Sequence, residues 1–210
     1  GAPKGALTEA SDVRPNTRKG RVRAELEQEA LSRAEAGEFR LSVVRASDFY
    51  GPAVKDAIFG DRFLPPLLAG KPGQLFGTRT ARHSYSYVPD FAATLVAAGR
   101  RDPQAPETWL VPNDRPVTIP ELETLIAALL PERGLPASAR ITTVGAGALR
   151  LAGLFMPAAG EVVEMLYEWN RDFVTDTSRT QTVLGLSPTP LEDGLRAAIA
   201  WYASGMRAAA

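Results

Sequence analysis

The order of helix-like and strand-like segments constrains the fold more than any other feature of this sequence. A helix is expected to begin at a cap, Asn16 or Thr17, and to run to about Gly37. Its apolar residues recur every four positions, at Val22, Leu26, Ala30 and Ala34. Segment 39–45, FRLSVVR, reads as a short buried strand. A helix followed by a buried strand favours a parallel sheet, so we expect an α/β fold.

Short strands and helices alternate along the rest of the chain. The firmest helix is expected over 118–130, where Thr118 is a cap and Glu121 lies in the first turn. Strands are expected at 73–77, 83–88, 108–113 and 139–144, and further helices at 88–100, 147–155, 161–169 and 191–206. The Gly145 turn, GAGALR, lacks a third glycine and is interpreted as a connection.

Composition excludes several classes of function. The 24 basic and 24 acidic residues cancel, which argues against nucleic acid and anionic membranes as partners. Apolar runs such as 91–99 are much shorter than the ~20 residues of a membrane span. Cysteine is absent, which favours the cytoplasm and removes thiolate chemistry. The single histidine has no acidic or cysteine cluster beside it in the sequence, so no metal site is expected.

Three segments occur in an order that resembles a known family. They are RASDFYGP (45–52), SYSYVPDFA (84–92) and the stretch from RDFVTDTSR to AWY (171–202). Together they resemble the extended short-chain dehydrogenase/reductases, the NAD-dependent epimerase/dehydratase family. The resemblance covers about residues 7–202. It implies an α/β fold consisting of part of a Rossmann-like parallel sheet plus a smaller mixed α/β substrate-side domain.

The resemblance also implies a domain organisation and a cofactor. Residues 1–52 would be a remnant of the dinucleotide-binding domain, and residues 53–210 a substrate-side region interleaved with late Rossmann strands and helices. NAD or NADP would be bound mainly by a Gly-rich N-terminal half that these residues do not include. The expected function is an NAD(P)-dependent oxidoreductase or epimerase acting on a small molecule, with the isolated chain inactive. We also expect a homodimer or a complementing N-terminal half, since an open sheet edge would otherwise be exposed.

Members of this family carry Tyr-x-x-x-Lys on the helix before the Arg45 strand, with Glu four residues later. Counting back eighteen residues from Arg45 places that Glu at Glu27, the lysine position at Arg23 and the tyrosine position at Lys19. The resemblance therefore makes Lys19 and Arg23 the catalytic candidates. It makes Arg23, Arg45 and Ser47 the candidates for cofactor binding.

The dyad chemistry is not preserved, which leaves alternatives open. A register based on Glu25 gives Arg21 and Thr17, and neither register restores a tyrosine. The five cations from Arg14 to Arg23 form either an anion-binding patch near a helix N-terminus or a solvated face. In the second case Arg21 would pair with Glu25, and Arg23 with Glu27. A non-catalytic dinucleotide-sensing or protein-interaction module is therefore the alternative function.

Five further residues are candidate substrate contacts: Asp48, Tyr50, Arg82, His83 and Tyr85. Asp48 replaces an asparagine common in the family, and its carboxylate would repel a diphosphate; otherwise it is a turn residue. Tyr50 is alternatively a packed ring. Arg82 and His83 lie near a phosphate-gripping arginine of relatives, and are alternatively an exposed loop pair. Tyr85 shares a strand face with Tyr87, as core or as cleft wall.

Aromatic and methionine side chains near the C-terminus could line an apolar cleft. They are Phe155, Met156, Met165, Tyr167 and Trp169. Residues of this kind on helices usually belong to the core, so both interpretations stay open.

Overall fold

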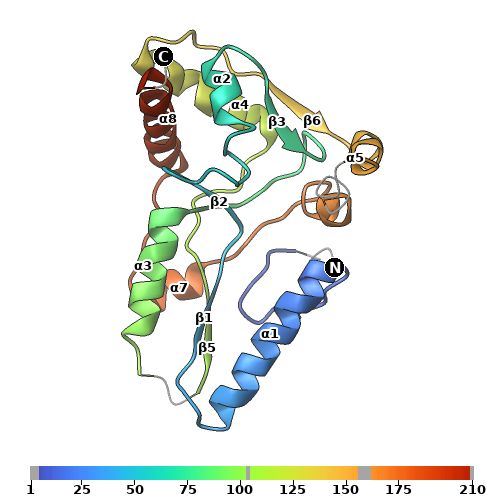
Figure 1. Cartoon of the computed structure of the whole chain (residues 1–210). Coiled ribbons are helices and arrows are strands. Elements are labelled where there is room, and N and C mark those ends of the chain that lie inside the picture. Colours follow the sequence, from blue (N-terminus) through green and yellow to red (C-terminus); the bar gives the residue numbers. More distant parts are fainter. Residues whose placement is uncertain (1–4, 103–104, 156–161, 209–210) are drawn as a thin grey trace.

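The computed structural model describes residues 5–102, 105–155 and 162–208 of the chain. One half is organised around two short parallel strands, β1 (Ser42–Arg45) and β5 (Glu107–Leu110), with Ser42 opposite Glu107 and Arg45 opposite Leu110. Helices α3 (Val88–Gly99) and α7 (Ser178–Leu184) pack against this pair, whereas α1 (Arg18–Glu35) lies on its other side (Figure 1). The helix-then-strand order of the sequence thus produces the expected parallel pairing. The predicted strand over 39–45 was too long, since it begins only at Ser42.

Helix α1 begins where the sequence predicted, because the Thr17 hydroxyl accepts a hydrogen bond from the Gly20 amide at 2.9 Å. No residue of this fully described helix is buried. The predicted apolar stripe is present, but Val22 is 59% and Leu26 is 70% exposed. The β1–β5 sheet is only two strands wide, so the described chain does not cover this stripe.

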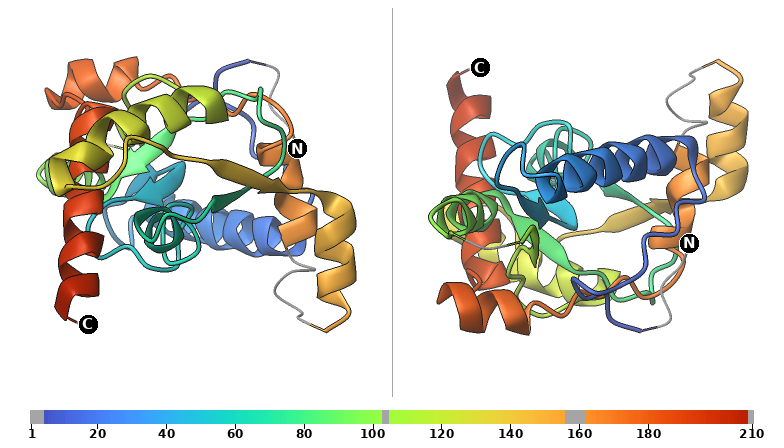
Figure 2. Two further views of the ribbon diagram at one scale, coloured as in Figure 1. Left: turned by 90° about the horizontal axis from the view of Figure 1, so that it is seen from above. Right: turned by 90° about the horizontal axis from the view of Figure 1, so that it is seen from below.

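The other half contains two more parallel strand pairs. Strand β2 (Asp48–Tyr50) pairs with β4 (Tyr85–Tyr87), and β3 (Gly73–Phe76) pairs with β6 (Ile141–Val144). Around them lie α2 (Leu64–Leu68), α4 (Ile119–Leu129), η1 (Leu130–Arg133), α5 (Ala146–Gly153), η2 (Leu166–Glu168) and α8 (Leu191–Ala208), as Figure 2 shows from two sides. The largest hydrophobic core lies in this half and is built mainly from α2, α4, α8 and the rings around β2 and β4.

The other predicted elements are present, but three strands are shorter than predicted by at least two residues. The strands predicted over 83–88, 108–113 and 139–144 are observed as Tyr85–Tyr87, Glu107–Leu110 and Ile141–Val144. The helix expected over 161–169 consists of four helical residues, 162–165, followed by η2. Residue 161 and Met156 lie outside the described residues. No helix in the described ranges is both long and apolar enough to cross a membrane.

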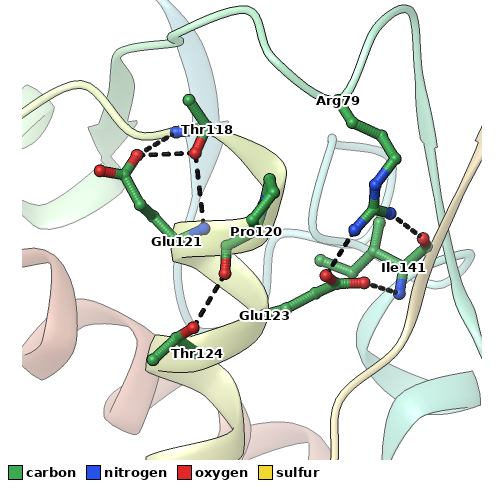
Figure 3. A network of polar contacts seen from close by, with 7 residues as sticks. All are labelled: Arg79, Thr118, Pro120, Glu121, Glu123, Thr124 and Ile141. Atoms are coloured by element: carbon green, nitrogen blue, oxygen red, sulfur yellow. Dashed lines mark hydrogen bonds and ion pairs between the residues drawn. The ribbon is translucent and has the colours of Figure 1, made fainter.

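A polar network fixes α4 and strand β6 relative to each other (Figure 3). Thr118 and Glu121 form the predicted capping box at the start of α4. Further along the same helix, the Glu123 carboxylate accepts hydrogen bonds from the Ile141 amide at 2.7 Å and from Arg79 at 2.6 Å. Arg79 also donates to the Ile141 carbonyl at 2.7 Å. These hydrogen bonds fix the position of the β3–β6 pair, which forms one wall of the cleft described below.

Candidate functional site

The site begins where the chain leaves the carboxyl end of β1, the end of a parallel strand at which α/β proteins bind ligands. Ser47 is buried there, and its amide and hydroxyl both contact the Ser86 hydroxyl, at 3.0 and 2.9 Å. Ser86 in turn donates to Asn113 Oδ1 at 3.0 Å. This buried network ties the start of β2 to β4 and to the loop after β5. The next side chain along, Asp48, is thereby held at a fixed place.

Asp48 opens strand β2, opposite Tyr85, so the prediction of a turn aspartate was wrong. The reason is that the chain continues after β1 in an extended conformation to pair with β4. Asp48 Oδ2 accepts a hydrogen bond from Trp169 Nε1 at 3.0 Å and lies 2.9 Å from His83 Nε2. The Asp48 side chain is still 27% exposed. The carboxylate is therefore fixed on one side and open on the other.

His83 is only 4% exposed, so the alternative of an exposed loop residue was wrong for it. Its backbone amide and carbonyl pair with Val117, and its ring stacks on Phe173 with centroids 5.1 Å apart. The approach to Asp48 is short but lacks hydrogen-bond alignment, and neither imidazole nitrogen has a hydrogen-bond partner among the described residues. A buried polar ring without partners costs free energy and calls for an explanation.

Arg82, the neighbour of His83, is exposed, and its backbone amide donates to Asp172 Oδ1 at 2.9 Å.

Tyr50 and Tyr85, the two tyrosines that the sequence analysis made candidate substrate contacts, are core residues. Tyr85 packs its ring on Phe59 with centroids 4.5 Å apart, and burial raises the pKa of its phenol. Burial also raises the pKa of Tyr50, which lies next to α8 and is 2% exposed. Both phenols therefore stay protonated at neutral pH.

Glu168, at the end of η2 and next to Trp169 in sequence, is a partly buried carboxyl that the sequence analysis did not single out. Its Oε1 accepts a hydrogen bond from the Tyr167 hydroxyl at 3.0 Å. Burial raises the pKa of the Glu168 carboxyl, and the nearby Asp48 charge raises it further; Tyr167, His83 and Arg23 act in the opposite direction. Burial and the carboxylate together raise the pKa of Tyr167 to about 12. No motif marks Glu168, and only its position beside Trp169 could have drawn attention to it.

One cation of helix α1, Arg23, acts electrostatically on this region. Lys19 and Arg23 are both exposed, and the Arg23 charge acts on Glu168. The Arg23–Glu27 pair considered from the sequence is replaced by another: Glu27 pairs with Arg45, whose Nε lies 3.3 Å from Glu27 Oε2. Arg45 is the better partner because it meets the carboxylate with two of its guanidinium nitrogens.

A cleft of about 520 Å³ opens beside Asp48 and Trp169. Phe76 and Leu149 are apolar parts of its lining, and Lys55 and Arg62 are among the charged residues on it. Its size and mixed lining are those of a small-molecule site. Among the residues that the structure describes, no group of three or more His, Cys, Asp or Glu side chains could hold a metal ion. The arrangement is suited to binding a polar ligand and exchanging protons with it.

Comparison with protein families gives one match to this chain. Residues 1–111 match the model of the NAD dependent epimerase/dehydratase family. The matched part includes α1, Arg45, Ser47, Asp48 and His83. None of the curated proteins matches the chain.

Solved structures show where this fold occurs. UDP-glucuronic acid 4-epimerase from Bacillus cereus, in complex with NAD, is 19% identical with a TM-score of 0.72, covering 97% of this chain and 58% of that one. MoeE5 in complex with UDP-glucuronic acid and NAD is 21% identical with a TM-score of 0.74, covering 98% and 62%. dTDP-glucose 4,6-dehydratase from Bacillus anthracis strain Ames, in complex with NAD, is 18% identical with a TM-score of 0.69, covering 97% and 57%. The present chain thus spans about three fifths of their length.

Proposed function

Because this chain belongs to the NAD dependent epimerase/dehydratase family, as its sequence landmarks predicted, we propose that it acts as part of an NAD(P)-dependent oxidoreductase or epimerase. Its contribution is the substrate-side cleft. The observation that carries this proposal is the position of the cleft, which opens beside Asp48 just after the carboxyl end of β1. In this view residues 1–52 belong to the dinucleotide-binding domain and residues 53–210 to the substrate-side region.

The cofactor would meet this chain along α1. The Glu27–Arg45 pair supports the register that places Arg23 at the lysine position and Lys19 at the tyrosine position. Arg23 is exposed and acts on Glu168, so it fits the role of a cation that donates to a ribose or phosphate oxygen. Arg45 and Ser47 are engaged within the chain, and we assign them the role of holding α1 and β2 around that site. NAD, when bound, would supply a hydride acceptor.

The substrate would lie in the cleft against Asp48. Three of the similar structures hold UDP-glucuronic acid or UDP-glucose together with NAD. Here the open side of the Asp48 carboxylate would repel a diphosphate, so we propose a small polar substrate with no phosphate beside Asp48. Arg82 is a further candidate contact at an exposed position. Tyr50 and Tyr85 are buried in the hydrophobic core, so we assign them a structural role.

Calorimetric titration of NAD(H) and NADP(H) into the protein, at low and moderate salt, tests the proposal. We expect salt-sensitive binding that weakens about tenfold on Arg23→Ala, with a smaller loss on Lys19→Ala. Arg33→Ala is the matched control, because Arg33 lies on the same helix but pairs with Glu38 at its far end. Binding that is absent, or equally weakened by Arg33→Ala, would contradict a cofactor site on α1.

The alternative function is a non-catalytic module that contacts another protein surface, including a homodimer or a complementing N-terminal half. The exposed Val22 and Leu26 on a helix with no buried residue are the observation in its favour. Sedimentation of the protein with and without Leu26→Asp distinguishes the two. Loss of self-association together with absent dinucleotide binding would favour the interaction module.

A further inference from the structure

Asp48 is a charged residue of the cleft lining that the fold holds in place while one of its oxygen atoms stays without a partner. Its Oδ2 accepts a hydrogen bond from Trp169 Nε1 at 3.0 Å, and His83 Nε2 lies 2.9 Å from the same oxygen. Its Oδ1 accepts no hydrogen bond from the part of the chain that the structure describes. The side chain is 27% exposed, so Oδ1 is suited to a hydrogen-bond donor on the ligand.

The two side chains that hold Asp48 are not expected to cancel its charge. The Trp169 indole is a neutral donor. The His83 imidazole is 5% exposed and enclosed by rings, with its centroid 5.1 Å from that of Phe173 and 4.8 Å from that of Tyr85. Histidine is mostly uncharged at neutral pH unless its surroundings stabilise the cation, and here neither nitrogen has an aligned hydrogen bond within the described residues.

The other charged side chains of the cleft lining occur as sequence neighbours of opposite sign. They are Lys55 with Asp56 and Asp61 with Arg62, all four exposed on the segment between β2 and α2. Adjacent charges of opposite sign largely cancel at a distance, so each of these two pairs adds little net charge to the cleft. The negative charge of the lining is therefore concentrated at Asp48.

Aromatic rings lie beside the Asp48 carboxylate on the wall of the cleft. Trp169 and Phe76 both line the cleft, with ring centroids 5.2 Å apart. The hydrogen bond between Trp169 and Asp48 fixes the indole next to the carboxylate. A cation is attracted both to a carboxylate and to the electron-rich face of an indole. A neutral hydroxyl gains less from either group, and an anion is repelled.

We propose that the cleft binds a small amine, whose ammonium group donates to Asp48 Oδ1 and lies against the Trp169 indole. The rest of the ligand extends over the apolar part of the lining, which includes Phe76 and Leu149. This inference names the substrate class of the proposed function, and it rests on that function in taking the cleft as the ligand site. Binding alone is proposed, with no covalent step.

Three probes that share one ring and differ only in the head group test the proposal: cyclohexylamine, cyclohexanol and cyclohexanecarboxylate. At pH 7 the first is a cation, the second is neutral and the third is an anion. Protein labelled with ¹⁵N-tryptophan gives one indole signal for each of its three tryptophans, and Trp169→Phe identifies the signal of Trp169. Because Trp169 Nε1 donates to Asp48, following this signal by NMR during each titration measures binding next to the carboxylate.

We expect cyclohexylamine to bind at least about tenfold more tightly than cyclohexanol, and the difference to shrink as salt is added. Cyclohexanecarboxylate should bind least. In Asp48→Asn the amide oxygen can still accept from Trp169, but the preference for the amine should fall to about threefold or less. Asp56→Asn is the matched control, because it removes another carboxylate of the same lining, and it should retain most of the preference.

Three results would overturn the proposal. They are an alcohol that binds as tightly as the amine, a Trp169 signal that does not respond to the amine, and a preference that Asp56→Asn removes but Asp48→Asn retains. The order of the three head groups in the unmodified protein, with its dependence on salt, keeps the test decisive should Asp48→Asn fold poorly.

The charge state of His83 is measured separately, since it is the single histidine of the chain and ¹⁵N-histidine labelling gives one set of imidazole signals. A protonated imidazole at pH 7 would neutralise Asp48 and overturn the proposal. Absent dinucleotide binding together with an intact preference for the amine would overturn the proposed function and leave the amine site standing. Dinucleotide binding without that preference would overturn only the amine site, so the two failures are distinguishable.

Discussion

Glu27 of α1 and Arg45 at the end of β1 form an ion pair that joins the helix to the strand pair. Arg45 Nε lies 3.3 Å from Glu27 Oε2, and a second guanidinium nitrogen contacts Glu27 Oε1. The Arg45 side chain is 28% exposed and that of Glu27 is 21% exposed, so the pair is partly sheltered from screening by salt. No residue of α1 is buried, so this pair is one of the contacts that hold α1 against β1.

Glu27→Gln should lower the free energy of unfolding by about 1–2 kcal/mol, because it leaves a partly buried guanidinium without its counter-charge. Urea denaturation measures this loss, and hydrogen exchange should show it concentrated in α1. The control is Glu38→Gln, which breaks the more exposed Arg33–Glu38 pair and should cost at most about 0.5 kcal/mol. Equal costs in the two variants would show that the Glu27–Arg45 pair has no special role.

Gly194→Ala should destabilise the protein by about 1–3 kcal/mol, because α8 packs its backbone directly on Tyr50. A Cβ at Gly194 would stand 2.5 Å from the Tyr50 hydroxyl, and Tyr50 lies two residues after Asp48 in β2. Thermal and urea unfolding measure the effect. Gly205→Ala on the same helix meets nothing within 4 Å and should be neutral or stabilising by up to about 1 kcal/mol. A neutral Gly194→Ala would show that Tyr50 can move without cost.

Local patterns in the sequence predicted local structure well. The Thr118 capping box and the Thr17 cap lie where predicted, because a cap depends on residues within one turn. Segment 39–45 misled for the same reason: its apolar residues resemble a strand, yet only Ser42–Arg45 pairs with another strand.

The site itself depends on contacts between distant parts of the chain. The Asp48–Trp169 hydrogen bond joins residues 121 positions apart, and no periodicity reports such a contact. The resemblance directed attention to Asp48, which falls inside segment 45–52, and to His83, which lies next to segment 84–92. Glu168 lies outside every motif, and its link to Asp48 is electrostatic, since the Asp48 charge raises the pKa of the Glu168 carboxyl.

Glu168→Gln should change how stability depends on pH. The pKa of this carboxyl is raised in the folded protein by burial and by Asp48, so ionising it opposes folding. The wild type is then stabilised at pH values below the unfolded pKa of Glu168 and loses that contribution as pH rises through the folded one. Glu168→Gln lacks this titration and should be the more stable protein at pH 7, with the difference shrinking toward pH 4. Urea midpoints between these pH values measure it.

The control for this pH dependence is Glu164→Gln, since Glu164 lies on the same segment and is exposed, and a Gln oxygen can still accept the hydrogen bond that Glu164 receives from the Arg18 amide. Its urea midpoint should follow that of the wild type across the whole pH range. A Glu168→Gln protein that is less stable than the wild type at pH 7 would mean that the Tyr167 hydrogen bond outweighs the cost of burying the charge.

Asp48→Asn should make the cleft more receptive to phosphate-bearing ligands. The substitution removes a negative charge from the cleft wall, while the amide oxygen can still accept from Trp169 Nε1. Calorimetric titration with UDP-glucose should show affinity rising about three- to tenfold at low salt, and the gain should shrink as salt screens the charge. Asp102→Asn is the control, because Asp102 forms an exposed pair with Arg40 and does not line the cleft. If Asp48→Asn leaves the affinity unchanged, the phosphates do not approach Asp48, and charge repulsion there cannot be what excludes nucleotide-sugars.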